Sequence, residues 1–288
     1  MPVWFIRIAR HAAALAVTVI LGGILTAALV RNSPGFTADE RLLDPRLDAQ
    51  SRALIQSEHA ADRDVFRFYI RHVGAMLRGD WGVSQSLNAP IRDLVRSRLP
   101  VTAEIMAIGL VGGWILAFGF ALAAVCFRGW SRVGGSLSVV LLSVPSAALA
   151  VLIFTTRGPT RAIIALILFP RLFDYLRNLL TDAYARPHIV TARAKGVGPA
   201  RILAFHVLPV CAPQLLALAG VSASMAFGAA IPVETLCDLP GIGQLAWKAA
   251  VARDLPVLVS LTMLITLLTQ ACNVVSDWAG SGLKGARA

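Results

Sequence analysis

The sequence predicts an all-α membrane protein with six transmembrane helices, and three observations lead to this class. Of its 288 residues, 57% are hydrophobic and 15% are charged, whereas a soluble domain carries about 25% charged residues. Apolar stretches close to the 20 or so residues that cross a bilayer as a helix recur along the chain. The net charge is +11, and the cations lie between the apolar stretches. That distribution is the positive-inside pattern of a membrane protein rather than the basic face of a nucleic-acid-binding protein.

Five uncharged apolar stretches predict five of the six spans. They are Ala12–Val30, Ile105–Phe127, Val133–Thr156, Val207–Val233 and Leu255–Ser276. The first stretch follows Arg7 and Arg10 and is longer than the apolar region of a signal peptide. We therefore interpret it as an uncleaved helix whose amino end is cytoplasmic.

The remaining span is weaker, because Ala162–Pro170 is short and charged residues follow it directly. Charge distribution favours a crossing here: without it, the segment with six cations between Arg171 and Arg201 would face outwards, against the positive-inside rule. We therefore predict six helices with both chain termini in the cytoplasm. Asp174 and Arg177 are expected to pair on one helix face, directed towards protein or water rather than lipid.

Between the first two predicted spans lies a small external subdomain. Apolar residues at helical spacing predict an amphipathic helix over residues 65–77, ended by Gly79–Gly82. A second apolar stripe begins at Ile91 and is expected to end at Leu99-Pro100. The predicted division is residues 1–31 for the N-terminal segment and first span, 32–98 for the external subdomain, and 99–288 for the other five spans.

A basic segment between the fourth and fifth spans has the sequence signals of a short, sharply bounded helix. Pro187 suits the first helical position and Gly196 suits the position just past the helix end. Arg193 and Lys195 come late, near the negative end of the helix dipole. Gly198-Pro199 then turns the chain into another helix. Such a projecting helix suits a mechanical contact with a soluble partner, but on physical grounds alone an ordinary basic loop accounts for the segment about equally well.

The residues Thr191–Gly196, followed after nine residues by His206-Val207-Leu208-Pro209, resemble the signature loop of ABC importer permeases of the dipeptide/oligopeptide/nickel family. Further blocks resemble the same family in the right order. They are Gly79–Ser84, Arg98–Glu104, Ser143–Ser146 and the segment Val233–Pro256. Three departures stand out. The connection before the loop is shorter than usual, so a short, tilted or distorted fourth helix is expected. Pro187-His188 replaces an acidic–aromatic pair, and the Asp-Pro-Arg ending of the family is absent.

The resemblance implies a multi-pass protein of the bacterial inner membrane that forms half of the pore of an ATP-driven importer. Its cargo would be di- or oligopeptides or related small solutes, and residues 99–288 would be the permease core. The implied partners are a second, related permease in a heterodimer, two ABC ATPases, an extracytoplasmic substrate-binding protein and the lipid bilayer, without nucleic acid. The chain lacks a phosphate-binding Gly-x-x-x-x-Gly-Lys-Ser/Thr loop, so ATP and Mg²⁺ would be used by the partners. We expect no catalytic residue, metal ligand or cofactor on this chain.

The resemblance also supplies site residues. The ATPase-coupling helix would comprise Ile189, Val190, Thr191, Ala192, Arg193, Ala194, Lys195 and Gly196, and the loop would end at His206, Leu208 and Pro209. The resemblance further implies a re-entrant external element with Pro240, Gly241 and Gly243. Candidate pore or gate residues follow from the residues themselves: Glu234 is an acid at the outer end of the fifth span, and Ser143, Pro145, Ser222 and Ser224 are expected to set close helix packing around the pore. Glu234 and the serines have simpler alternatives: Glu234 would order the following loop by accepting backbone N–H groups, and each serine would bond its own helix backbone.

Two other protein classes fit the sequence less well. A secondary transporter is expected to show inverted repeats and broken midplane helices, and no repeat is visible in the sequence. A membrane-embedded enzyme needs a nucleophile–base set or a metal motif within its spans, such as His-Glu-x-x-His, and the apolar stretches contain neither.

Overall fold

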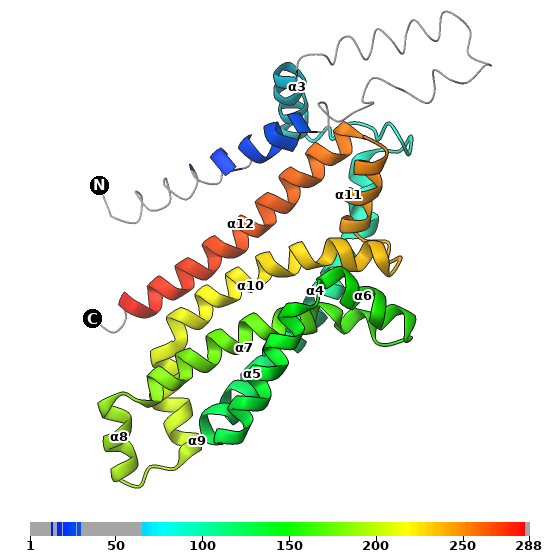
Figure 1. Ribbon diagram of the computed structural model, residues 1–288. Helices are drawn as coiled ribbons and strands as arrows, with labels where there is room; N and C mark the ends of the chain where they lie inside the picture. Colours follow the sequence, from blue (N-terminus) through cyan, green and yellow to red (C-terminus); the bar gives the residue numbers. More distant parts are fainter. Residues whose placement is uncertain (1–12, 14–15, 19, 27, 30–64, 286–288) are drawn as a thin grey trace, which may run out of the picture. The chain divides into compact units, whose positions relative to one another are not determined.

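A computed structural model describes residues 13, 16–18, 20–26, 28–29 and 65–285. The regular secondary structure within these ranges is helical, apart from one isolated antiparallel bridge between Val83 and Pro90. The principal helices are α3 Val65–Leu77, α4 Ile91–Cys126, α5 Arg128–Ser143, α6 Ser146–Thr155, α7 Ile163–Tyr184, α8 Pro187–Ala194, α9 Pro199–Ile202, α10 Leu208–Leu236, α11 Ile242–Val251 and α12 Leu255–Gly285 (Figure 1). The all-α prediction is confirmed for these ranges. Parts of the predicted first span, and residues 32–64 of the predicted external subdomain, lie outside the described residues.

The chain divides into two compact units. The first comprises Met1–Leu99 with Leu245–Leu268, and the second comprises Pro100–Gln244 with Thr269–Ala288. In the first unit, Tyr69 of α3 packs with Leu255 and Val259 of α12 in a small apolar core. The predicted amphipathic helix over residues 65–77 is therefore confirmed, although Leu77 at its end is exposed.

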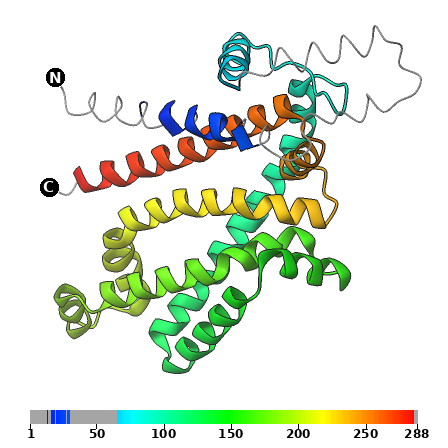
Figure 2. The same cartoon turned by 45° about the horizontal axis from the view of Figure 1, so that its top comes forward.

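Helix α7 is the centre of the second unit, and α5, α6 and α10 pack against it (Figures 1 and 2). Its fully buried side chains are Ile163, Ile164, Leu168, Leu172, Phe173, Leu176 and Leu180. Small residues on neighbouring helices permit the close approach: a Cβ on Gly109 of α4 would lie 2.5 Å from Cβ of Ile164, and one on Gly134 of α5 would collide with the Phe173 ring. Small residues at helix contacts are typical of membrane bundles.

Of the three alternatives for the fourth helix, the short one is wrong, because α7 has 22 residues and continues well past Pro170. A tilted or distorted fourth helix stays a prediction. The charged residues after Pro170 extend the helix rather than ending it, since they lie opposite its buried apolar face. The predicted pairing on that face is confirmed: Nη2 of Arg177 lies 3.7 Å from Oδ1 of Asp174.

The third apolar stretch, Val133–Thr156, is not one continuous helix as predicted. It divides into α5 and α6, which are bent by 97° at a short break. Pro145 explains the break, because a proline disfavours the helical conformation in the residue before it. Val144 accordingly takes an extended backbone with φ −90° and ψ 122°.

The predicted interruption at Leu99-Pro100 is also wrong, since α4 runs without a break for 36 residues with Pro100 inside it. A proline removes one backbone hydrogen bond from a helix, and membrane helices tolerate such losses where neighbouring groups compensate.

Three helices are long and apolar enough to cross a membrane, namely Ile91–Cys126, Pro199–Leu236 and Leu255–Gly280. A fourth is obtained if the bent pair of α5 and α6 counts as one span, and Ala16–Thr26 is a shorter apolar helix. Helix α7 is not among them, because charged residues occupy its second half. The structure therefore supports a helical membrane protein with three to four candidate spans in the part of the chain it describes.

Candidate functional site

Helix α8 begins and ends where its sequence predicts. Arg186, with φ −68° and ψ 143°, precedes the helix, and Pro187 occupies its first turn. Pro187 has a backbone angle that suits a first turn, and it has no N–H that the helix would leave unsatisfied. The helix of eight residues ends at Ala194, so the short, sharply bounded helix predicted from the sequence is confirmed.

The carboxyl end of α8 is closed by two backbone hydrogen bonds. The N–H of Gly196 donates to the carbonyl of Arg193 at 2.9 Å, and the N–H of Val197 donates to that of Ala192 at 3.2 Å. This pair is the Schellman motif, which needs a left-handed residue just past the helix end. Gly196 supplies it with φ +73°. The shape of the segment is therefore determined by its own backbone.

Only one side of α8 is attached to its unit. Ile189 is fully buried and Ala192 nearly so, and both belong to the main apolar core of that unit. The guanidinium of Arg193 lies over the Tyr184 ring, 5.4 Å from its centroid. The other predicted coupling residues are exposed, namely Val190, Thr191, Ala194, Lys195 and Gly196 together with Arg193 itself. The helix is thus anchored on one face and presents a mixed apolar and basic surface on the other.

The predicted end of the loop lies in a helical region with a local distortion. Residues Leu203–Val207 form a π-turn between α9 and α10. His206 lies within this turn, while Leu208 and Pro209 begin α10, and all three are half-buried. Pro209 has no N–H to donate to the carbonyl of Phe205, which is consistent with a wider turn just before it.

Glu234, near the end of α10, is fully buried and is bonded to the segment that follows it. Its Oε2 accepts the N–H of Gly243 at 2.6 Å and that of Gln244 at 3.3 Å. The N–H of Ile242 donates to Oγ1 of Thr102 at 2.8 Å. These donors belong to the first turn of α11, where helix N–H groups have no partner in their own helix. We call residues 234–244 the Glu234 turn.

Two glycines of the predicted external element are required by this turn. A Cβ on Gly241 would collide with the Glu234 carboxylate, and one on Gly243 would lie 2.7 Å from Cα of Ile231. Pro240, the third predicted residue, lies between them and the end of α10. The geometry supports the loop-ordering alternative for Glu234, while its role as a pore residue stays a prediction.

The other candidate pore residues are dispersed over the second unit. Ser143 is exposed and bonds the carbonyl of Val139 at 2.8 Å, and Pro145 lies at the break between α5 and α6. Ser222 and Ser224 of α10 bond the carbonyls of Ala219 and Gly220, at 2.8 and 3.3 Å. Each of the three hydroxyls thus bonds its own helix backbone, as in the simpler alternative.

Ser222 and Ser224 also contact other helices. Ser222 accepts the Trp114 indole N–H at 3.1 Å. Ser224 lies 3.4 Å from Oδ1 of Asn273 in α12.

Asp254 is a buried polar residue that sequence reasoning did not single out. Its Oδ2 accepts hydrogen bonds from Oγ of Ser84 at 2.6 Å and from Oγ and the N–H of Ser86 at 2.8 and 2.9 Å. Its Oδ1 accepts the N–H of Val257 at 3.3 Å and so caps α12. The sequence Asp254-Leu255-Pro256 carries the cap signal, but nothing in the sequence indicates the serines 168 and 170 residues away.

This chain belongs to the family described as the binding-protein-dependent transport system inner membrane component, whose model matches residues 99–283. It is therefore an inner-membrane component of an ABC importer and a transport subunit rather than an enzyme. The resemblance drawn from the signature loop is confirmed at this level.

Three relatives match nearly the whole chain. The glutathione transport system permease protein GsiC of Salmonella paratyphi A is 25% identical over 282 residues, covering 90% of this chain and 91% of the relative. GsiC of Salmonella choleraesuis is 27% identical over 285 residues, with the same coverage. The oligopeptide transport system permease protein AppB of Bacillus subtilis is 22% identical over 296 residues, covering 91% and 93%. The similarity extends over about nine tenths of this chain and of each relative, which agrees with a permease subunit.

Proposed function

We propose that this chain forms half of the translocation pore of an importer for short peptides, with six membrane spans. The spans would be the apolar stretch from Ala12, α4, the bent pair α5–α6, α7, α9–α10 and α12. Both chain termini would be cytoplasmic, as would α8, because the positive-inside rule favours that side for its basic segment. Residues 32–98 and the Glu234 turn would then face outwards, and residues 99–288 would form the permease core.

The observation that carries the proposal is the geometry of α8. A helix fixed by Pro187 and Gly196, anchored through Ile189 and exposed on its other face, can move with the bundle as a rigid body. We propose that its exposed face is seated in a groove of a cytoplasmic ATPase. Closure of two such ATPases on ATP and Mg²⁺ would then move α7, which precedes α8 in the chain, and α10, which follows it after α9.

The family description supports a binding protein as a further partner, and a second permease belongs to the same proposal. A binding protein would deliver substrate to the outer face, and a second, related permease would complete the pore. Glutathione and oligopeptides are named for the relatives. Short peptides with free termini are accordingly the substrates to test first. On this proposal the chain itself carries no cofactor.

Two glycines beside α8 provide a matched test of the coupling role. Neither has an atom within 4 Å of a Cβ placed on it, but only Gly196 has a positive φ. Gly196→Val should strain the turn by about 1–2 kcal/mol, whereas Gly198 has an extended backbone that valine accepts. We expect Gly196→Val to insert normally but to lose ATPase co-purification and peptide uptake, and Gly198→Val to retain both.

Equal uptake by the two variants would show that α8 is not the coupling helix. Loss of membrane insertion in Gly196→Val alone would instead indicate a role in folding. Reporter fusions after residues 100, 157 and 195 would test the proposed topology separately, with only the last expected in the cytoplasm.

A further inference from the structure

The second half of α7 carries a polar stripe opposite its buried apolar face. Exposed or partly exposed side chains recur at helical spacing, namely Arg171, Asp174, Arg177, Asn178, Thr181 and Asp182. The opposite face consists of Leu172, Phe173, Leu176 and Leu180, all fully buried. The helix is thus apolar towards its own unit and polar on the side that its own unit leaves uncovered.

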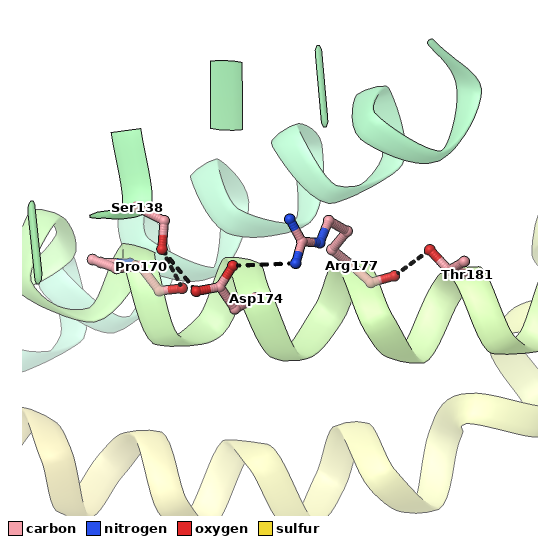
Figure 3. Close-up of polar contacts among 5 residues, drawn as sticks. All are labelled: Ser138, Pro170, Asp174, Arg177 and Thr181. Carbon is pink, nitrogen blue, oxygen red and sulfur yellow. Dashed lines mark hydrogen bonds and ion pairs between the residues drawn. The ribbon is translucent and has the colours of Figure 1, made fainter. Parts of the chain in front are cut away.

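The centre of the stripe is a set of three polar side chains from two helices (Figure 3). Oγ of Ser138, in α5, donates to Oδ2 of Asp174 at 2.8 Å. Oδ1 of Asp174 lies 3.7 Å from Nη2 of Arg177. The guanidinium of Arg177 lies over the Phe173 ring, 5.4 Å from its centroid. The buried Ser138 hydroxyl therefore orients Asp174, and the Phe173 ring orients Arg177. The side chains of Asp174 and Arg177 remain 40% and 31% exposed.

The position of these charges restricts what covers them. Asp174 lies near the middle of the 22 residues of α7, which we propose as a span. Charged side chains at that depth face protein or water, not lipid. The exposed residues Val139 and Val140 of α5 are apolar by contrast and suit a lipid-facing surface. The stripe also continues through Asn178 and Asp182 towards the end of α7 that precedes α8, which favours a water-filled path over a closed contact between subunits.

We propose that the Asp174–Arg177 pair lines the translocation path and receives substrates that carry both charges. Arg177 would face a substrate carboxylate and Asp174 a substrate ammonium group. This inference rests on the proposed function and adds a site within it. A separation of 3.7 Å makes a loose ion pair, and a guanidinium has five N–H donors, more than that pair uses. Each of the two side chains can therefore release the other and bind a charged group of the solute instead, while Ser138 keeps the Asp174 carboxylate in place.

Cysteine accessibility tests the proposal without a known substrate. The background would carry Cys126→Ala and Cys272→Ala and keep the buried Cys211 and Cys237. Single variants Asp174→Cys, Arg177→Cys and Asn178→Cys would be made in the complete transporter with its ATPases. Two membrane-impermeant methanethiosulfonate reagents would be used, one with a sulfonate and one with a trimethylammonium group.

Two positions serve as matched controls: Leu176→Cys is buried on the same helix, and Val140→Cys is exposed on the apolar face of α5. We expect labelling at the three stripe positions and none at the controls. Asn178→Cys removes no charge, so it remains informative if loss of either charge prevents assembly. Stripe cysteines as unreactive as Leu176→Cys, in a transporter that retains its ATPases, would overturn the inference and leave the proposed function intact.

The charge of the reagent tests the ionic part of the proposal. In Asp174→Cys the remaining Arg177 should favour the sulfonate reagent, and in Arg177→Cys the remaining Asp174 should favour the trimethylammonium reagent, each by about tenfold in rate. Labelling of both variants without this reversal would show a water-filled path that does not select by these charges, and it would overturn the substrate assignment.

Discussion

The Glu234 turn and helix α8 are both short segments of the second unit, one after α10 in the chain and one before it, yet they satisfy their polar groups in opposite ways. In the Glu234 turn a buried carboxylate accepts the N–H groups that begin α11, and two glycines leave no room for a side chain. In α8 the backbone closes on itself and most side chains remain exposed. The turn is thus occupied by contacts within the chain, whereas α8 leaves most of its side chains uncovered by the rest of its unit.

The largest expected effect is at Gly243, where the turn tolerates no side chain. In Gly243→Ala the new Cβ would lie 2.7 Å from backbone of α10, and backbone cannot move aside as a flexible side chain can. We expect a loss of about 3 kcal/mol in unfolding free energy, measured as a lower midpoint of thermal unfolding in detergent. Gly228→Ala is the control, since Gly228 is a glycine of α10 with open space around a Cβ placed on it. Equal midpoints for the two variants would show that the turn is looser than the structure indicates.

At α8 the comparison predicts separate effects for a buried and an exposed residue: the buried one should change the stability of the helix, and the exposed one should change ATPase binding. Ile189→Ala removes a fully buried side chain and should cost about 2 kcal/mol locally, seen as faster amide exchange in residues 187–197. Val190→Ala, at the neighbouring and exposed position, should leave exchange unchanged while weakening ATPase binding. If Val190→Ala bound the ATPase as the unmodified protein does, the exposed face of α8 would not be the docking surface.

Glu234→Gln distinguishes the two roles of this residue. A glutamine carbonyl can still accept the N–H groups of Gly243 and Gln244, so the unfolding free energy should change by no more than about 1 kcal/mol. If the carboxylate only orders the turn, peptide uptake should persist. A stable variant with lost uptake would instead restore Glu234 as a pore residue whose charge matters.

The smallest expected effect concerns pH and a histidine of the first unit. Nε2 of His72 lies 2.8 Å from Oγ of Ser260. Burial lowers the pKa of His72 below its usual 6.5, and nearby Asp80 opposes that shift. The unfolded chain therefore binds a proton at His72 more readily than the folded protein does. The contribution of neutral His72 to the unfolding free energy is thus fully present above about pH 6.5. It is lost as pH falls through the lower pKa of the folded protein.

Thermal unfolding between about pH 5 and pH 8 measures this dependence. His72→Gln keeps a hydrogen-bonding group but does not titrate, so it should show a flatter pH profile. An unchanged profile in that variant would assign the pH dependence to other groups.

Local signals predicted local structure well. Pro187 and Gly196 indicated both ends of α8 because capping depends on the backbone of adjacent residues. The break at Val144–Pro145 was missed because the apolar run is uniform and a proline within a membrane helix does not always interrupt it, as Pro100 demonstrates. The length of α7 was underestimated because its charges were counted without the buried face opposite them. The bonds from Asp254 to Ser84 and Ser86 depend on tertiary packing, which residue spacing does not encode.

The hydrogen bonds that end α8 have a consequence for assembly. Because Gly196 and Val197 close the helix within the chain, its conformation does not depend on a partner to order it. With the role proposed for α8, docking of the ATPase would avoid most of the entropy loss that a disordered segment would incur. The permease could then be synthesised and inserted before any ATPase arrives, and α8 would already be folded when the ATPase binds.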